Sequence, residues 1–387
     1  MSVSSRRITG ATMLIGLLGA GLVTLALVEA SAAPSSARRA GSGAEPAGLP
    51  AAARPDAVGI AGTAGTTGIA ASSRAALRLL SQAAAAGLAT SYQGVQIVAW
   101  LGPHGNSTSV VHVWHERNRG ILAQVTGMGS APAAPSAQTS PGEQDPDGIL
   151  GLSRQLVDLM RANYQVTSAG RGSADGRPAQ LVDLRRPDGS LAARFWLDAE
   201  TKLPLRRETF DASARMISED AFISLQIGDS GLRGMPASDV RPWSARLDPA
   251  QIARLSTQGW PIREKLPGNL TLVAAHAATT PAGQVIGLDY CDGLSVVSIF
   301  LQRGQLPAAM PGWREIALRG HAVYSTHPDL RSLAWSAHGF VYTLIAEAPP
   351  ATVDQVVDAL PHDAGPGFWG RIARGLRRLA SLANPFR

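Results

Sequence analysis

The stretch that decides the fold is Leu181–Gly228, which reads LVDLRRPDGSLAARFWLDAETKLPLRRETFDASARMISEDAFISLQIG. Four short runs of strand-forming residues follow one another in it, and turn residues separate them. The turns are Pro187-Asp188-Gly189, Asp198–Thr201 and Asp211–Ser213, where Pro presets φ and Gly accepts positive φ. These connections are too short for crossover helices, so the four strands should pair antiparallel as a curved meander.

The second run, Leu191–Leu197, alternates as a strand with one buried face should. Its apolar face carries Leu191, Ala193, Phe195 and Leu197, and its other face carries Ala192, Arg194 and Trp196. Successive side chains of a strand point to opposite faces, so this pattern predicts a sheet with an inner apolar face and an outer mixed face.

Length and composition predict two folded units with unstructured margins. The chain has 387 residues, which is too long for one ordinary core, and its hydrophobic content of 45% is typical of a globular protein. The expected division is: 1–32, a signal peptide or N-terminal membrane anchor; 33–73, a disordered linker; 74–228, the first domain; 229–248, a linker; 249–362, a smaller α+β domain; 363–387, a basic amphipathic tail.

The N-terminus is typical of export. Arg6-Arg7 precedes the uncharged run Ala11–Val28, and Ala30-Ser31-Ala32 fits a cleavage site. The run is also long enough for a tilted membrane span, so a cleaved signal peptide and an uncleaved anchor both stay open. Either predicts an extracytoplasmic location, associated with the membrane or the cell envelope.

The first domain should begin with an amphipathic helix over Arg74–Ala89, buried through Leu77, Leu80, Ala84 and Leu88. Strands are expected at Tyr92–Leu101, Ser109–Arg117 and Ile121–Thr126, then a helix at Ile149–Asn163 and a strand at Tyr164–Ser168 before the meander.

The second domain should start with a helix at Pro249–Gln258. Strands are then expected at Asn269–His276, Val285–Tyr290, Leu294–Arg303, Trp313–Leu318, Ala322–Ser325, Leu330–Ala337 and Phe340–Glu347, before a closing helix over Val353–Leu360. Short strands with a helix at each end predict an antiparallel α+β unit.

The basic charge is concentrated in the C-terminal tail. The net charge is +6, and the segment 366–387 holds five arginines and no acid. The body is therefore close to neutral, and no nucleic-acid groove is implied. In the tail, apolar residues share one helical face and arginines the other, which favours contact with an anionic membrane surface over a helix packed on the body. The expected contact residues are Phe368, Trp369, Arg371, Ile372, Arg374, Leu376, Arg377 and Arg378.

Three strings resemble the MucB/RseB family, the sigma-E regulatory proteins. They are Ser91-Tyr92-Gln93-Gly94, the stretch from Arg194 to Glu208, and Cys291–Phe300, and the resemblance spans roughly 75–360. It implies a first domain like the lipoprotein carriers LolA and LolB, a half-open β-barrel with helices on its concave face. It also implies binding to the extracytoplasmic part of a membrane-bound anti-sigma factor and a response to lipid.

No residue pattern predicts catalysis or a cofactor. His112 and His115 should point to opposite faces of one strand, and Cys291 has no base fixed near it by sequence. The acids Glu219-Asp220 are expected at the surface. We therefore predict a non-enzymatic regulator, with Arg194, Arg206 and Glu208 as an outer docking surface. The alternative is a lipid or lipoprotein carrier that holds an acyl chain in the half-barrel.

Overall fold

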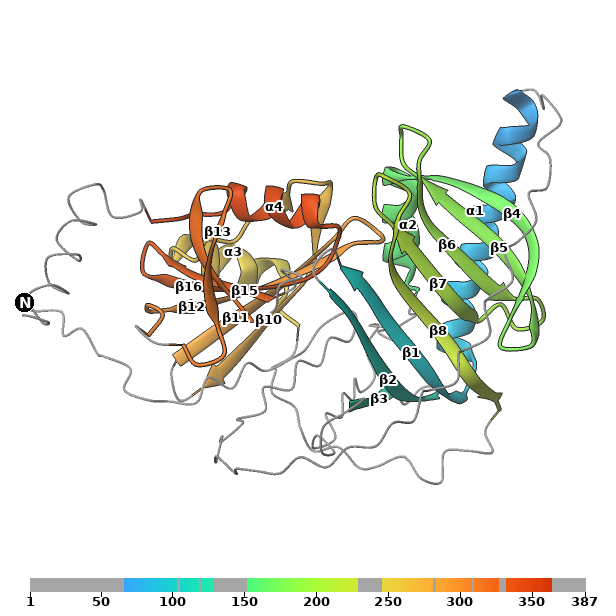
Figure 1. Cartoon of the computed structure of the whole chain (residues 1–387), viewed down its shortest axis with the longest axis horizontal. Helices are drawn as coiled ribbons and strands as arrows, with labels where there is room; N and C mark the ends of the chain where they lie inside the picture. Colours follow the sequence, from blue (N-terminus) through green and yellow to red (C-terminus); the bar gives the residue numbers. More distant parts are fainter. Residues whose placement is uncertain are drawn as a thin grey trace, which may run out of the picture.

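The structure is a computed structural model of the chain, and it describes residues 66–102, 105–117, 120–127, 152–228, 246–280, 283–307, 310–326 and 332–363. These residues form two antiparallel sheets of eight strands each, with helices against each sheet (Figure 1). The expected signal peptide or anchor and the basic tail lie outside the described residues.

The first sheet confirms the predicted curved α+β half-barrel. Its strand order is β3-β2-β1-β8-β7-β6-β5-β4. The strands are β1 Tyr92–Gly102, β2 Gly105–Glu116, β3 Gly120–Gly127, β4 Gln165–Ala174, β5 Arg177–Arg185, β6 Leu191–Asp198, β7 Pro204–Phe210 and β8 Met216–Ile227. The four predicted meander strands are β5 to β8. Pairing of β1 with β8 joins them to the N-terminal hairpins.

Side-chain hydrogen bonds fix the predicted turns. Asp188 Oδ1 accepts from the backbone N–H of Ser190 at 2.9 Å, and Gly189 has φ +85°. In the next turn Asp198 Oδ1 accepts from the N–H groups of Glu200 and Thr201. The short polar side chains therefore supply the bonds that these tight reversals leave unpaired.

Two helices, α1 (Thr66–Ala89) and α2 (Arg154–Asn163), lie on the concave side, and α1 runs along β4 and β5 (Figure 1). The helix start expected at Arg74 was too late. The start expected at Ile149 was too early, because Ser153 is the N-cap and accepts from the N–H of Leu156. Leu88, predicted to be buried, is 48% exposed, since the buried stripe of α1 ends at Ala84.

The helices close the concave face over β4 to β6 with a packed apolar core. The core side chains from α1 and α2 are Ala76, Leu80, Ala83, Ala84, Val157 and Met160, with Leu152 just before α2. They pack on the sheet residues Val166, Val182, Leu184, Ala192, Ala193, Phe195 and Leu197. The predicted inner face of β6 is thus confirmed for Ala193, Phe195 and Leu197. The prediction was wrong for Ala192, which is buried in this core, and Leu191 is only half-buried, because the register between β5 and β6 shifts at this point.

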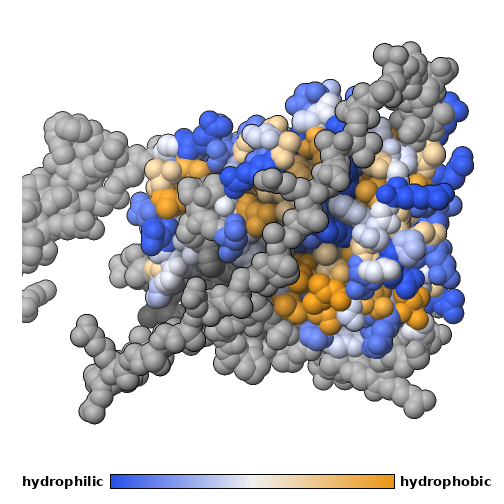
Figure 2. All heavy atoms as spheres, turned by 45° about the vertical axis from the view of Figure 1, so that its right-hand side comes forward, coloured by the Kyte–Doolittle hydropathy of each residue, from blue (hydrophilic) through white to orange (hydrophobic). Residues whose placement is uncertain are grey.

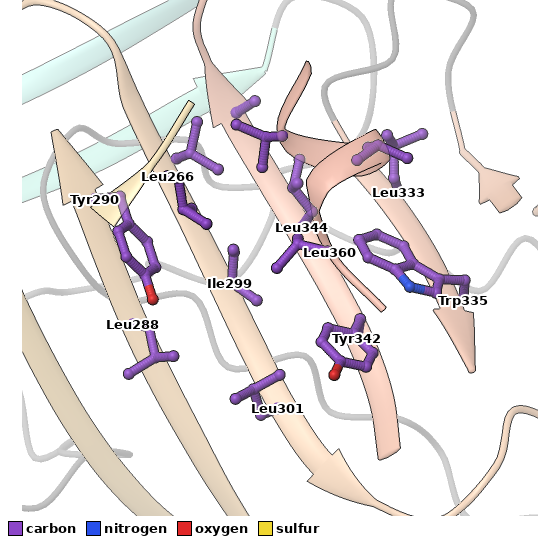
Figure 3. Close-up of a cluster of buried hydrophobic side chains, with 14 of the residues drawn as sticks. Leu266, Leu288, Tyr290, Ile299, Leu301, Leu333, Trp335, Tyr342, Leu344 and Leu360 are labelled. Carbon is purple, nitrogen blue, oxygen red and sulfur yellow. The ribbon is translucent and has the colours of Figure 1, made fainter. Parts of the chain in front are cut away.

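The second sheet has the order β13-β14-β15-β16-β12-β11-β10-β9. Its strands are β9 Lys265–Leu266, β10 Leu270–Thr280, β11 Gly283–Cys291, β12 Val296–Arg303, β13 Arg314–Leu318, β14 His321–Ser325, β15 Ser332–Ala337 and β16 Phe340–Glu347. The helices α3 (Pro249–Thr257) and α4 (Pro350–Ala359) pack on it. Figure 3 shows side chains of this core on neighbouring strands, among them Tyr290, Tyr342 and Trp335.

Two further expectations about individual residues were wrong. The strand expected from Leu294 begins at Val296, because Asp292–Ser295 forms a turn that Asp292 caps. Asp220, expected at the surface, is 3% exposed. It lies on the concave face of β8, where Arg207 of β7 pairs with it directly across the strands.

Candidate binding surfaces and the junction of the two units

The two units meet where the β11–β12 turn reaches the C-terminal end of α2. The hydroxyl of Tyr164 donates to Oδ2 of Asp292 at 2.7 Å, and the amide of Asn163 donates to the backbone carbonyl of Asp292 at 2.8 Å. Asn163 ends α2 and Tyr164 follows as its C-cap residue. One helix end therefore holds both the side chain and the backbone of one turn residue.

The Asp292 carboxylate is buried, and both of its oxygens accept hydrogen bonds. Its Oδ1 accepts from the N–H groups of Leu294 at 2.8 Å and Ser295 at 2.7 Å, while Tyr164 donates to Oδ2. Burial raises the pKa of Asp292 above its ordinary value, and these hydrogen bonds offset part of that rise. Burial and the negative charge of Asp292 also raise the pKa of Tyr164, so its hydroxyl keeps its proton and donates.

The next two turn residues complete the contact. Gly293 has φ +106°, and a Cβ at this position would lie 2.6 Å from the backbone nitrogen of Met160. Only glycine satisfies both the positive φ and the close approach. Leu294 is 9% exposed and belongs to the apolar core of the first unit. The second unit therefore contributes a core residue to the first.

Beside this turn lies a buried ion pair with charge from both units. Arg207 of β7 donates through Nε to Asp220 Oδ2 at 2.8 Å. Burial lowers the pKa of the Arg207 guanidinium, but attraction to Asp220 and to Glu347 of β16 outweighs it and holds that pKa above its ordinary value. Arg207 and Asp220 line a cavity of about 40 Å³ between the two units, which has room for water and is far too small for an acyl chain.

Arg186 ties the turns of the meander together close to the same cavity. Its guanidinium donates to the carbonyl of Leu191 at 2.8 Å, to that of Asp211 at 3.2 Å and to that of Phe210. One side chain thus joins the β5–β6 turn to the β7–β8 turn. Sequence inspection gave no reason to single it out.

The predicted docking residues Arg194, Arg206 and Glu208 do lie together on the outer face of the first sheet. We call the side chains around them the outer strip. Its members are Asp183, Arg194, Trp196, Arg206, Glu208 and Glu219, which come from four adjacent strands.

The charges of the outer strip are paired rather than free. Arg194 makes a two-pronged contact with Asp183, at 2.6 and 2.9 Å. Arg206 contacts Glu208 at 2.5 Å and Glu219 at 3.0 Å, and its guanidinium carbon lies 4.9 Å from the centre of the Trp196 ring. A half-buried indole beside pre-oriented arginines is a typical composition for a protein-binding surface.

Apolar side chains also reach the surface of the first unit. Ile223 of β8 is 51% exposed, and Figure 2 shows an area of hydrophobic surface next to hydrophilic side chains.

The histidines and the cysteine that the sequence singled out have packing roles. His115 is buried, its Nδ1 lies 2.8 Å from the carbonyl oxygen of Thr90, and its ring stacks on Tyr92. His112 stacks on Trp114 instead, which confirms the opposite faces. Cys291 is buried, and its sulfur accepts from the N–H of Gly293 at 3.1 Å. Among the described residues no three His, Cys, Asp or Glu side chains are placed to bind a metal.

The tail residues Phe368, Trp369, Arg371, Ile372, Arg374, Leu376, Arg377 and Arg378 lie outside the described residues, so their membrane role stays a prediction. The uncharged run Ala11–Val28 lies outside them as well. Within the described ranges, no helix is both long enough and apolar enough to cross a membrane.

The described residues define a class of fold, a helix-closed half-barrel joined to a second α+β unit. The family model of the MucB/RseB N-terminal domain matches residues 131–245, which include α2 and β4 to β8. The resemblance first seen in short sequence strings is thereby confirmed.

Solved structures with a similar chain include MucB alone, 19% identical with a TM-score of 0.46, where the match covers 76% of this chain and 98% of MucB. The Pseudomonas aeruginosa MucA/MucB complex is 20% identical with a TM-score of 0.43, covering 75% of this chain and 100% of the matched one. A LolA superfamily protein from Nitrosomonas europaea is 10% identical with a TM-score of 0.18, covering 70% and 91%. No curated protein sequence matches the chain.

Proposed function

We propose that this chain is a non-enzymatic extracytoplasmic regulator that binds a membrane-bound anti-sigma factor, or a related single-span membrane protein, and so modulates envelope-stress signalling. The match of residues 131–245 to the MucB/RseB N-terminal domain carries this proposal. The use of His115 and Cys291 in packing, and the paired charges on the sheet, support a binding role rather than a chemical one.

The direct test is capture of the partner in its own membrane. Crosslinking in cells, followed by affinity purification of the tagged chain from membranes, should yield one single-span protein joined through its extracytoplasmic part. Repeated capture of no such protein would contradict the proposal.

The outer strip is the surface we propose for docking. Replacing Arg194 and Arg206 together by Gln should lower partner capture about tenfold or more, since arginines beside a half-buried indole are typical binding hot spots. Arg254 of α3 is exposed and lies on the second unit, so Arg254→Gln serves as the matched control. Equal capture by both variants would move the docking site elsewhere.

We also propose that the tail binds anionic membrane. Replacing Arg371, Arg374, Arg377 and Arg378 by Gln should weaken binding to anionic vesicles, most at low salt, because each arginine near such a surface contributes about 1 kcal/mol. Vesicles of neutral lipid are the control. Binding that does not change with the four substitutions would refute this role.

A response to lipid stays a proposal of its own. Over β4 to β6 the concave face is filled by side chains of α1 and α2, so an acyl chain there would have to displace them. Native mass spectrometry of protein purified without detergent is the test. Bound lipid would support the carrier alternative, and its absence would count against it.

A further inference from the structure

The turn Asp292–Ser295 belongs to the second unit, but its residues bond to and pack into the first. The hydrogen-bonded residues lie far apart in the sequence, with Tyr164 and Asp292 separated by 128 positions. This contact therefore joins two separately built sheets rather than neighbours along the chain.

The contact combines three kinds of complementarity within four residues. Asp292 is held by a hydroxyl and by an amide from the end of α2. Gly293 allows the turn to approach the backbone of Met160. Leu294 fills a place in the apolar core of the first unit. Such a contact fixes a single relative position of the two units, since a shift breaks all three at once.

The surroundings of the turn allow it to come apart without unfolding either sheet. Next to it are a cavity of about 40 Å³ and the Arg207–Asp220 pair, which can be rehydrated when the units separate. The second sheet keeps its own core away from this contact, and the core of the first unit loses only Leu294 when the turn withdraws. Contacts between units in one chain are in general smaller and more polar than cores, so they open first.

We propose that the Asp292–Ser295 turn is a plug that locks the second unit onto the half-barrel, and that its withdrawal from the end of α2 is the conformational switch of this molecule. In the open state Leu294, Met160 and the Arg207–Asp220 pair become accessible to a partner. The inference does not depend on the proposed partner, and the experiment below needs no partner.

The chain carries its own reporter for this movement. Cys291 is its single cysteine, is buried, and directly precedes the plug. Its sulfur accepts a hydrogen bond from the N–H of Gly293 at 3.1 Å, so it lies directly against the plug. Labelling of the full chain with a thiol reagent such as Ellman's reagent therefore measures how often the plug withdraws.

Two substitutions weaken the plug in different ways. Tyr164→Phe removes one hydrogen bond to a buried carboxylate and should speed labelling of Cys291 roughly 10- to 100-fold. Gly293→Ala adds a methyl group against Met160 at a positive φ and should speed it at least as much. Tyr342→Phe is the matched control, because the buried hydroxyl of Tyr342 has no hydrogen-bond partner in the described part of the chain. It should label at the wild-type rate.

The dependence of labelling on urea separates withdrawal of the plug from global unfolding. Withdrawal exposes little surface, so the labelling rate should rise only weakly with urea below the unfolding transition. The proposal is overturned if Tyr164→Phe, folded by circular dichroism, labels at the wild-type rate. It is equally overturned if wild-type labelling follows urea with the full slope of global unfolding.

Discussion

The two sheets have the same number of strands and the same antiparallel pairing, yet different interactions hold them. The first carries buried or half-buried ion pairs across its strands, such as Asp183–Arg194 and Asp220–Arg207. The second has an unbroken apolar core around Trp335 and Tyr342. Of its described ion pairs, Arg319–Asp354 lies at the surface, with the arginine side chain 54% exposed. The comparison shows that sheets with the same number of antiparallel strands can have different sources of stability.

The largest expected effect is on the core of the second sheet. Trp335→Ala should reduce the free energy of unfolding by about 3–5 kcal/mol, because it removes a fully buried ring that stacks on Tyr342. Urea unfolding followed by circular dichroism would measure the loss. Phe195→Ala, equally buried in the first unit, is the matched variant. If both variants shifted the unfolding transitions of both units equally, the two cores would unfold as one, and the proposed difference between the sheets would be wrong.

The next effect concerns the ion pairs of the first sheet. Asp220→Asn should cost about 3 kcal/mol, because it leaves the buried Arg207 without its carboxylate. Replacing Asp220 and Arg207 together by Leu should recover most of this stability. Asp354→Asn in the second unit should cost less than about 1 kcal/mol, as exposed pairs do. Equal losses for Asp220→Asn and Asp354→Asn in urea unfolding would contradict the proposed difference.

Each unit also holds one histidine whose titration is linked to stability. Burial lowers the pKa of His115 in the first unit. In the second, burial and the stacked His321 lower that of His362, while Val357, Asp358 and Asp363 act against this. Folding therefore favours the neutral rings. The stability they contribute is fully present above the unfolded pKa of about 6.5 and is lost as the pH falls through the lower folded value.

The measurement for this pH effect is the urea midpoint at a series of pH values from 8 to 5. His362→Phe keeps an aromatic ring against Trp335 and should flatten the acid loss in the second unit alone. An unchanged pH dependence in this variant would rule out His362 as the responsible group.

The smallest effect is expected on the outer strip. Arg206→Gln should change the free energy of unfolding by less than about 1 kcal/mol, because its side chain is one third exposed and water screens its ion pairs. Thermal unfolding would detect a larger effect. A loss above about 2 kcal/mol would mean that the strip stabilises the sheet, and a weaker partner interaction could then not be assigned to docking.

Local chemistry made much of the fold predictable. The turn residues at Asp188-Gly189 and Asp198 and the alternation in β6 determine the meander without help from distant parts of the chain. The outer positions of Arg194 and Arg206 follow from the same alternation. The family resemblance implied one half-barrel sheet for the first domain, but not that β1 and β8 are the strands that join its two halves.

The junction was not predictable, because its contacts join residues more than a hundred positions apart. Asp220 looked like a surface acid, since its partner Arg207 faces it only after β7 and β8 pair in the observed register. Leu294 looked like the start of a strand, although it belongs to the core of the other unit. The burial of Asp220 and the packing of Leu294 in the other unit both depend on tertiary contacts, which a short stretch of sequence does not reveal.

The pairing of β1 with β8 has a consequence for how the molecule folds. Gln93 and Gln226, whose side chains bond across these strands, are 133 positions apart. The second sheet instead closes through hairpins and through β12–β16, whose partners are much nearer in the chain. The chain loses conformational entropy when a long loop closes, before the contacts between its ends form. High contact order therefore slows folding. We therefore expect the half-barrel to finish folding after the second sheet, although it is synthesised first. Until β8 pairs with β1, the N-terminal hairpins should remain exposed.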